Sequence, residues 1–299
     1  FYPNDYDGIW ASCPAINWTQ FLASGLWAVT VMNEYDHILG FHKINAFRDA
    51  VHNSVGGKEN YFQVEERIDF DPYTILGQKT KGGKITEKDC LVMQEIWKGP
   101  HTTGNDFLWY SFLPGGTFWN KIIPIGSFYY PLIGKRPKCF SLVEQYVHLA
   151  FEDPKKDLLH LKIRDFEKVF DTCIRKLGWL SCDHADLRPF ANAGGKLIID
   201  HGLDDPLIPV EGTIDYYHHM REIHGGQNFI DRFCRLYINP GDGHGNCHTN
   251  GPGMTESTGI QALMNWVEHN KAPENLPAVL VNQKTGKTIR KGIVKPWRV

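Results

Sequence analysis

His244 is the residue of this sequence whose surroundings best suit acid–base chemistry. It lies between Gly243 and Gly245, directly after a stretch in which the apolar residues Leu236 and Ile238 alternate as in a β-strand. A turn rich in proline and glycine ends that strand, and the flanking glycines leave the imidazole free of neighbouring side chains. Because an imidazole titrates near neutral pH, such a histidine is a candidate general base. On this local pattern alone, a turn histidine without a catalytic role is equally well supported.

A carboxylate that could pair with this histidine lies one strand earlier. The apolar run at 194–201 is typical of a strand buried on both faces, and Asp204 and Asp205 follow it. Functional residues gather at the carboxyl ends of parallel strands, and neighbouring strands lie about 5 Å apart. An aspartate here could therefore bind His244, fix its tautomer and stabilise the imidazolium. Asp205 before Pro206 would alone suggest only a turn, but next to His244 we interpret it as the catalytic acid.

The elements that must position this pair alternate between strand and helix. After the run at 194–201, the sequence predicts a helix over 211–224, a strand that ends near Ile238 and a final amphipathic helix. The final helix is predicted to bury one face, which carries Ile260, Leu263, Met264 and Val267. This order is typical of an α/β fold with a parallel sheet.

Residues 1–190 add one strand and a long insertion. Residues 8–12 predict a short buried strand, whereas the chain from 19 to 190 lacks strand–helix alternation and contains aromatic-rich helices. One of these helices has apolar residues at helical spacing, at Phe166, Val169, Phe170, Cys173 and Leu177. We therefore predict a core strand in 1–18, an inserted domain in 19–190 and the rest of the core, with the acid and base, in 191–299.

Composition and charge argue against several classes of function. The 299 residues carry a net charge of −2, which gives no electrostatic reason to expect nucleic acid or an anionic membrane as partner. The longest apolar runs are too short to cross a bilayer. The seven cysteines form no C-x-x-C motif, and their odd number leaves one thiol free or bonded outside this chain. The start at Phe1 looks like the middle of a longer polypeptide.

Six motifs, taken in order, resemble the tannase/feruloyl esterase family, which also includes hydrolases of mono-hydroxyethyl terephthalate. They are Tyr2-Pro-Asn-Asp-Tyr-Asp-Gly-Ile9, Pro14-Ala15 with Asn17-Trp18, His201-Gly-Leu-Asp-Asp-Pro-Leu-Ile-Pro209, Asp215-Tyr-Tyr217, Pro240-Gly-Asp-Gly-His244, and Trp266-Val-Glu with Ala272-Pro273. The resemblance spans nearly the whole chain and is strongest at both ends. It implies an α/β-hydrolase core, partial in this chain, with a large lid domain inserted before the strand that carries the acid.

The resemblance also implies roles for individual residues. By position, Asp205 matches the triad acid and His244 the general base, while Asp204 fits less well because the family's aspartate immediately precedes the proline. The family's nucleophilic serine lies in a Cys-Ser-x-Gly-Gly elbow upstream of the first motif. We therefore expect the serine on a preceding N-terminal segment or on a separate chain of the same enzyme. Ser12 follows a strand but lacks the glycines of an elbow.

One departure from the family pattern concerns cysteine. In the family, a cysteine beside the histidine forms a disulfide with the cysteine of the serine elbow. Here Gly245 follows His244, and Cys247 is the candidate for that bond. Alternatively, His244, Cys247 and His248 could hold zinc, although the chain contains no H-E-x-x-H motif.

A second departure concerns calcium. The family's lid carries an aspartate-rich calcium loop, which matches residues 52–60 here. His52, Val55 and Glu59 replace its three aspartates. Because calcium requires several hard oxygen ligands, we expect no calcium in this loop. We also expect no other bound metal and no cofactor.

Aromatic side chains of the lid are candidates for binding substrate. Phe107, Trp109, Tyr110 and Trp119 could clasp a phenolic acyl group, although packing within the lid explains them equally well. The expected function is a serine ester hydrolase acting on small aromatic esters, hydroxycinnamoyl or galloyl. The alternative is a catalytically inactive family member that binds phenolic ligands. The family favours a secreted protein. Val51 and Ile68 replace the two cysteines that bracket the family's calcium loop, which favours a less oxidising compartment; we expect secretion.

Overall fold

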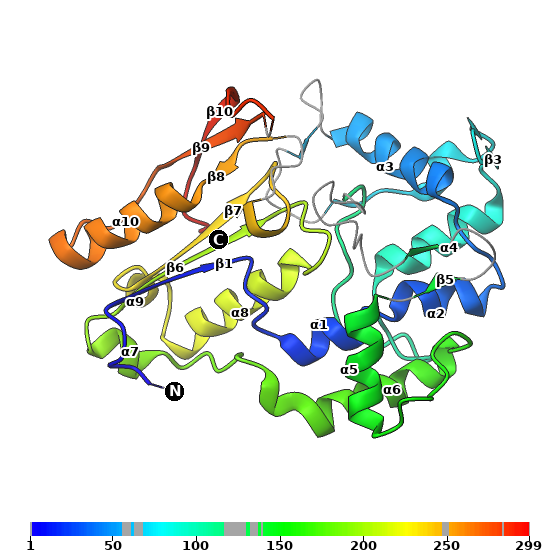
Figure 1. Cartoon of the computed structure of the whole chain (residues 1–299), viewed down its shortest axis with the longest axis horizontal. Helices are drawn as coiled ribbons and strands as arrows, with labels where there is room; N and C mark the ends of the chain where they lie inside the picture. The colour runs from blue at the N-terminus through cyan, green and yellow to red at the C-terminus, as the bar shows by residue number, and fades with distance from the viewer. Residues whose placement is uncertain are drawn as a thin grey trace.

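The central sheet is parallel and is built from segments far apart in the sequence. The computed structural model describes residues 2–55, 61–62, 68–116, 130–131, 137–138, 140–246, 251–282 and 284–298. Within them the strand order is β1 (Gly8–Ser12), β6 (Lys196–Gly202) and β7 (Cys234–Asn239), with both pairings parallel. Figure 1 shows these three strands side by side. The predicted α/β fold and its three strands are confirmed.

Each face of the sheet is covered by a helix. Successive side chains of a strand point to opposite faces, so Ile198 lies in a different apolar cluster from Leu197 and Ile199. The helix α10 (Glu256–His269) packs Ala262 and Trp266 into the cluster of Ile198. The helix α8 (Val210–Ile223) packs with α9 (Gln227–Ile230) on the opposite face, where Tyr217 joins Leu197 and Ile199. Two-sided cover explains why every residue of β6 after Lys196 is buried.

The predicted buried face of α10 is wrong in part. Gly259, Ala262 and Trp266 are the buried residues of this helix, whereas Ile260 is 46% exposed and Met264 is 50% exposed. The helix is therefore rotated relative to the predicted stripe. Ile260 and Met264 stay uncovered, at the edge of the sheet where β1 has no further strand beside it among the described residues.

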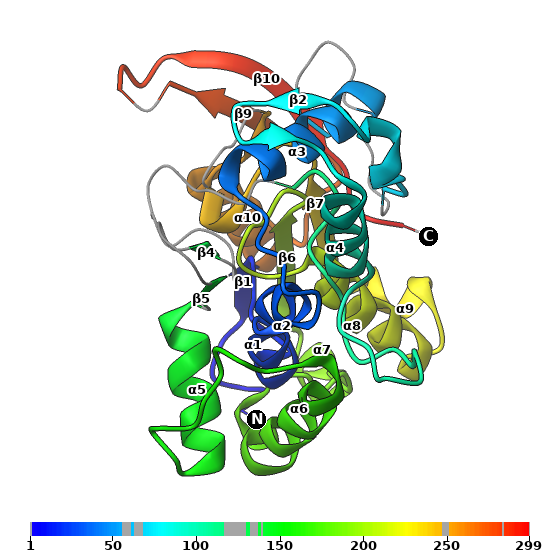
Figure 2. The same ribbon diagram turned by 90° about the vertical axis from the view of Figure 1, so that its right-hand side faces the viewer.

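The region between β1 and β6 is mainly helical. Its principal helices are α1 (Trp18–Ser24), α2 (Trp27–Glu34), α3 (Phe41–Val55), α4 (Glu87–Lys98), α5 (Ser141–Phe151), α6 (Ile163–Leu177) and α7 (Arg188–Asn192). The described part of this region also contains the 3-10 turns Pro72–Ile75 and Gly178–Leu180 and two small hairpins, β2 (Lys79–Thr80) with β3 (Gly83–Lys84) and β4 (Tyr130–Pro131) with β5 (Pro137–Lys138). The predicted helix α6 is confirmed, because all five of its predicted apolar residues are buried. Figure 2 views the molecule from this region, with α1 and α2 in front of β1 and β6.

The C-terminal part adds an antiparallel sheet. It consists of β8 (Gly253–Met254), β9 (Leu276–Val281) and β10 (Thr288–Val294). Beyond β10, Trp297 N–H donates to the carbonyl of Leu236 and covers the outer edge of β7. No helix in the described part of the chain is both long enough and apolar enough to span a membrane.

Candidate active site

Asp205 lies in the loop that connects β6 to α8. One oxygen of its carboxylate, Oδ1, accepts the backbone N–H groups of Leu207 (2.7 Å) and Ile208 (3.0 Å). Aspartate commonly stabilises a turn in this way, and here the turn directs the chain from the strand into the helix. The other oxygen, Oδ2, faces the end of the neighbouring strand. The side chain is fully buried, so its charge must be compensated by these partners.

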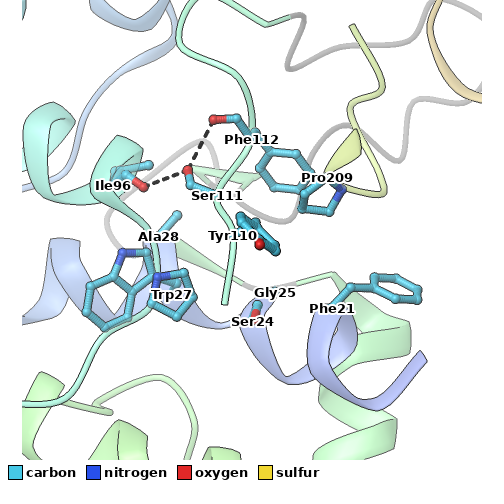
Figure 3. Close-up of a pocket in the computed structure, with 11 residues that line it drawn as sticks. Phe21, Ser24, Gly25, Trp27, Ala28, Ile96, Tyr110, Ser111, Phe112 and Pro209 are labelled. Carbon is cyan, nitrogen blue, oxygen red and sulfur yellow. Dashed lines mark hydrogen bonds between the residues drawn. The ribbon is translucent and has the colours of Figure 1, made fainter. Parts of the chain in front are cut away.

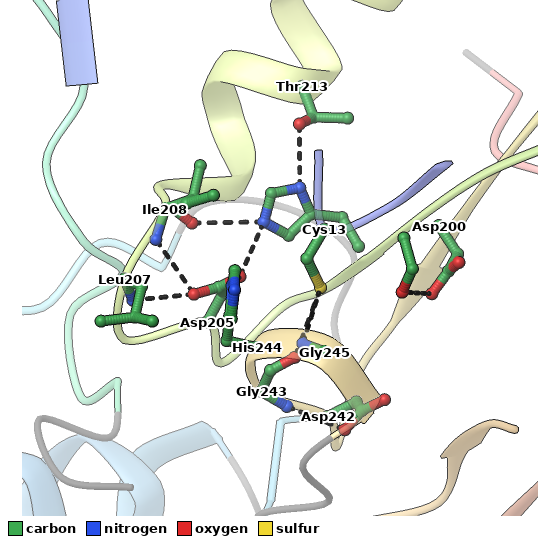
Figure 4. A network of polar contacts seen from close by, with 12 residues as sticks. Cys13, Asp200, Asp205, Leu207, Ile208, Thr213, Asp242, Gly243, His244 and Gly245 are labelled. Carbon is green, nitrogen blue, oxygen red and sulfur yellow. Dashed lines mark hydrogen bonds and ion pairs between the residues drawn. The ribbon is translucent and has the colours of Figure 1, made fainter. Parts of the chain in front are cut away.

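His244 begins the 3-10 turn His244–Asn246 after β7 and meets this carboxylate. Its Nδ1 lies 2.9 Å from Asp205 Oδ2, and its side chain is 28% exposed (Figure 4). With the proton on Nδ1, the ring donates to Oδ2, and Nε2 is the nitrogen available to take another proton. Gly245 has a φ of +61°, a value that favours glycine and so explains this residue directly after the histidine. The structure thus brings together the two residues that the sequence predicted as acid and base.

A close backbone approach holds the two loops together. A Cβ atom on Gly202 would lie 2.3 Å from the carbonyl oxygen of Gly243 and 2.4 Å from that of Asp242. Only glycine allows the end of β6 to approach the histidine loop this closely. The backbone N–H of Asp204 also donates to the carbonyl of Asp242, at 3.0 Å. Asp204 therefore joins the two loops through its backbone, while Asp205 binds the histidine.

The hydrogen bonds of the pair set the protonation of both groups. Burial alone would raise the pKa of the Asp205 carboxyl, but hydrogen bonds from His201 and His244 outweigh it and hold the pKa below its usual range. Burial alone would lower the pKa of His244, but the hydrogen bond and the charge of Asp205 raise it above its usual value. The pair therefore consists of an ionised acid and a base of increased proton affinity.

Two further residues of this site were missed by sequence reasoning. His201, near the end of β6, is fully buried, and its Nε2 lies 3.1 Å from Asp205 Oδ2. Its position near the end of β6, four residues before Asp205, could have indicated that it lies beside this carboxylate. Cys13, directly after β1, donates its thiol to the carbonyl of Gly243 (3.6 Å) and accepts the N–H of Gly245 (3.3 Å). Cys13 therefore contacts the backbone on both sides of His244.

The cluster of Cys13, His201 and Asp205 resembles a metal site only in its distances. Their candidate ligand atoms all lie within 4.8 Å of one another. Burial, followed by the charges of Asp205 and Asp200, raises the pKa of the Cys13 thiol well above its usual value, so the thiol keeps its proton. A metal would need a thiolate and a free nitrogen lone pair, but the Nε2 of His201 faces two acceptors. These residues fit a hydrogen-bonded cluster instead.

The segment predicted to match the family's calcium loop does not fit calcium at the positions described. His52 is buried, donates from Nε2 to the carbonyl of Gly115 (3.0 Å) and stacks on Phe62. Burial lowers its pKa, which favours the neutral ring. The side chain of Val55 packs against the core and has no oxygen to offer. Glu59 lies outside the described residues.

The aromatic candidates differ in their surroundings. Tyr110 lines a small, mainly apolar hollow of about 20 Å³, next to Phe112 and Pro209 (Figure 3). Trp109 is only 7% exposed and lines a smaller hollow next to it, whereas Phe107 is 61% exposed at the surface. Trp119 lies outside the described residues.

Of the positions that the sequence connected with the nucleophile, the structure describes Ser12 but not Cys247. Ser12 donates its hydroxyl to Asp200 Oδ2, at 3.2 Å, and not to His244. Cys247 and His248 lie outside the described residues, so the expected disulfide and the zinc alternative stay predictions. The five cysteines that the structure describes are free thiols.

Comparison with known proteins identifies the family. The chain matches the family model described as tannase and feruloyl esterase over residues 135–297, more than half of its length. It is 29% identical over 297 residues to a probable feruloyl esterase of Arthroderma benhamiae, covering 93% of this chain and 52% of the relative. It is 24% identical over 223 residues to a tannase of Aspergillus oryzae, covering 69% and 37%. The chain thus spans about half the length, or less, of these curated relatives.

Solved structures agree on the fold. Feruloyl esterase B from Aspergillus oryzae superposes with a TM-score of 0.81 at 18% identity, covering 99% of this chain and 61% of that one. Tannin acyl hydrolase from Aspergillus niger superposes with a TM-score of 0.77 at 22% identity, covering 99% and 58%. These similarities confirm the predicted α/β-hydrolase fold. The chain belongs to the tannase and feruloyl esterase family.

Proposed function

We propose that this chain supplies the acid and the base of a serine carboxylic ester hydrolase. The observation that carries the proposal is the 2.9 Å contact between Asp205 Oδ2 and His244 Nδ1, at the carboxyl ends of neighbouring parallel strands. The same arrangement activates a hydroxyl nucleophile in serine hydrolases. The names of the relatives, feruloyl esterase and tannase, support an ester as the substrate.

In this mechanism, His244 moves one proton in each half of the reaction. Nε2 takes the proton of the serine hydroxyl as the oxygen attacks the ester carbonyl, and then gives it to the departing alcohol. An acyl-enzyme remains. A water molecule then gives a proton to Nε2 as its oxygen attacks the acyl carbonyl, and Nε2 passes this proton to the serine oxygen as that oxygen leaves. Throughout, Asp205 keeps the other ring proton on Nδ1 and stabilises the transient imidazolium.

The nucleophile is proposed to come from a segment outside these 299 residues. The matched relatives are about twice as long as the part that the chain covers. Among the described residues, β1 has a partner strand on only one side, and Ile9 (39% exposed), Ile260 and Met264 leave apolar surface uncovered there. An unpaired edge of a parallel sheet with apolar residues beside it is suited to receive a further strand. Such a strand would extend the sheet next to the acid–base pair.

An aromatic acyl group is the proposed substrate moiety, and residues 19–190 are the proposed lid. The aromatic wall that Phe21, Tyr110 and Phe112 form supports this, because such walls suit a phenolic ring, although the hollow of about 20 Å³ would have to open to admit one. Its wall also includes Pro209, which follows the loop residue Ile208 that binds Asp205. Secretion stays a prediction, which detection of the protein in the culture medium would test.

Hydrolysis of model esters by the full-length protein tests the proposal. We expect turnover of methyl ferulate or methyl gallate, and a loss on the order of 10⁶-fold in kcat for His244→Ala. His269→Ala, which removes an exposed histidine of α10, is the matched control and should leave the rate unchanged. Full activity of His244→Ala would exclude the proposed base. Binding of these esters without turnover would instead favour the inactive, phenol-binding alternative.

A further inference from the structure

His201 binds the catalytic acid from the side opposite to solvent. Its Nε2 lies 3.1 Å from Asp205 Oδ2 and 3.2 Å from the carbonyl oxygen of Ile208, and its Nδ1 lies 2.8 Å from the hydroxyl of Thr213. The side chain has no exposed surface, so it cannot exchange these partners for water. Figure 4 shows Thr213 and Ile208 on the same side of Asp205.

The partners of His201 determine where its proton lies. A carbonyl oxygen can only accept a hydrogen bond, so the contact with Ile208 requires a proton on Nε2. The same N–H is shared with the carboxylate of Asp205. The hydroxyl of Thr213 can then donate to Nδ1, and a neutral ring satisfies all three contacts.

The shared atom is the oxygen that also binds the base. Oδ2 of Asp205 accepts Nδ1–H of His244 at 2.9 Å and Nε2–H of His201 at 3.1 Å, while Oδ1 accepts two backbone N–H groups. We propose that His201 is a positioning residue, which fixes the orientation of Asp205 Oδ2 toward His244 and limits how strongly this oxygen stabilises the protonated base. This inference rests on the proposed function of the Asp205–His244 pair.

His201 limits the stabilisation of protonated His244 because both rings donate to the same oxygen of Asp205. A hydrogen bond from His201 stabilises the negative charge on Oδ2, which then binds Nδ1–H of His244 less strongly. Without His201, the oxygen would favour the charged form of His244 more, and the base would be protonated at a higher pH. A general base works best when its pKa lies near the operating pH, so this restraint would increase the active fraction near neutrality.

Among the described residues, four other buried titratable groups lie near this arrangement: Cys13, Asp200, and Asp204 and Asp242 in the two loops that carry Asp205 and His244. The thiol of Cys13 lies beside His201 and Asp205, and burial raises its pKa well above the usual value. Asp200, one residue before His201, faces Trp10, Ser12 and Asn239 through its carboxylate. Burial raises the pKa of Asp200 to about 6, so its own titration must be separated from that of His244 by a residue-specific signal.

Two substitutions in the full-length protein separate positioning from packing. His201→Gln keeps a side-chain N–H that can reach Asp205, whereas His201→Leu removes the donor and keeps an apolar volume. For His201→Leu we expect kcat to fall roughly 10-fold with little change in KM, and the acid limb of the kcat/KM profile to move up by about half to one pH unit. For His201→Gln, kcat should stay within a few-fold of the wild-type value, and the acid limb of the kcat/KM profile should not move.

Controls cover misfolding and general effects of losing a buried histidine. Thr213→Val removes the hydroxyl that holds Nδ1 and should shift the limb in the same direction by a smaller amount, which keeps the proposal testable if His201→Leu does not fold. His224→Gln replaces another buried histidine, which binds the carbonyl of Met220, and should leave the profile unchanged.

Titration of His244 by NMR, assigned with His244→Asn, makes the result independent of turnover. If the wild type hydrolyses no ester, the proposed function fails, while the His244 titration in the same variants still decides the role of His201. An unchanged titration of His244 in folded His201→Leu and Thr213→Val would overturn the inference. Equal loss of activity in His201→Gln and His201→Leu would also overturn it, because it would show that His201 acts only through packing.

Discussion

Replacing Asp205 by asparagine is the most informative perturbation of this site. The carboxylate accepts four N–H groups, two from histidine rings and two from the backbone of Leu207 and Ile208. An amide offers one accepting oxygen and one donating NH2 group. If the oxygen keeps the backbone N–H groups, the NH2 group faces His244, whose Nδ1 must then become an acceptor. The ring would carry its proton on Nε2, which is the wrong tautomer for a base.

The size of the effect can be worked from the geometry. A carboxylate and an imidazolium about 4 Å apart attract each other by about 4 kcal/mol at an effective dielectric of 20, and this stabilisation exists only when the ring is charged during the reaction. Its loss corresponds to roughly 10³-fold in rate. The tautomer change adds to this, so we expect kcat to fall by roughly 10³–10⁴-fold, as in other triads.

The assay compares two adjacent variants of the full-length protein. Steady-state hydrolysis of methyl ferulate and methyl gallate is measured for Asp205→Asn and for Asp204→Asn, the neighbouring buried aspartate whose backbone N–H donates to the carbonyl of Asp242. We expect at most a roughly 10-fold loss for the second variant. If Asp205→Asn kept more than a tenth of the wild-type kcat, or if Asp204→Asn were the more damaging change, the assignment of the acid would be refuted.

Three further predictions follow from the same geometry. Since the pKa of His244 is raised and the base must be neutral, kcat/KM should increase with pH through a value above the ordinary histidine pKa of about 6.5; a limb below 6 would contradict this. Gly202→Ala should lower kcat at least roughly 10-fold and destabilise the fold by about 1–3 kcal/mol in chemical denaturation, because its Cβ would displace the histidine loop, whereas Gly40→Ala has open space around the new Cβ and should change little. A thiol reagent should modify the exposed Cys182 in the native protein but not the buried Cys13, with activity retained; modification of Cys13 in the folded protein, detected by mass spectrometry, would contradict its role as a buried contact of the histidine loop.

The sequence contained enough information to predict the sheet and the proximity of Asp205 and His244. The strand at β6 is a continuous apolar run between glycines, and its polar residues follow where a parallel strand must end. Because β7 is the next strand along the chain and pairs with β6, Asp205 and His244 could be placed together without the structure.

Other features depend on contacts that no local pattern contains. The apolar stripe of α10 is real, but periodicity alone does not show that Ile260 and Met264 extend past the covered part of the sheet. Cys13 gains its role from Gly243 and Gly245, which lie more than 200 residues away in the chain. Nor does the composition of an aromatic segment distinguish Tyr110, which lines a hollow, from the exposed Phe107.

Labelling with a fluorophosphonate tests the central claim most directly. This reagent reacts covalently with a serine that is activated by a histidine base, and peptide mass spectrometry locates the labelled residue. The account predicts that the full-length protein is labelled on one serine outside these 299 residues, and that His244→Ala and Asp205→Asn abolish the labelling. Label on Ser12, or labelling that persists without His244, would contradict it.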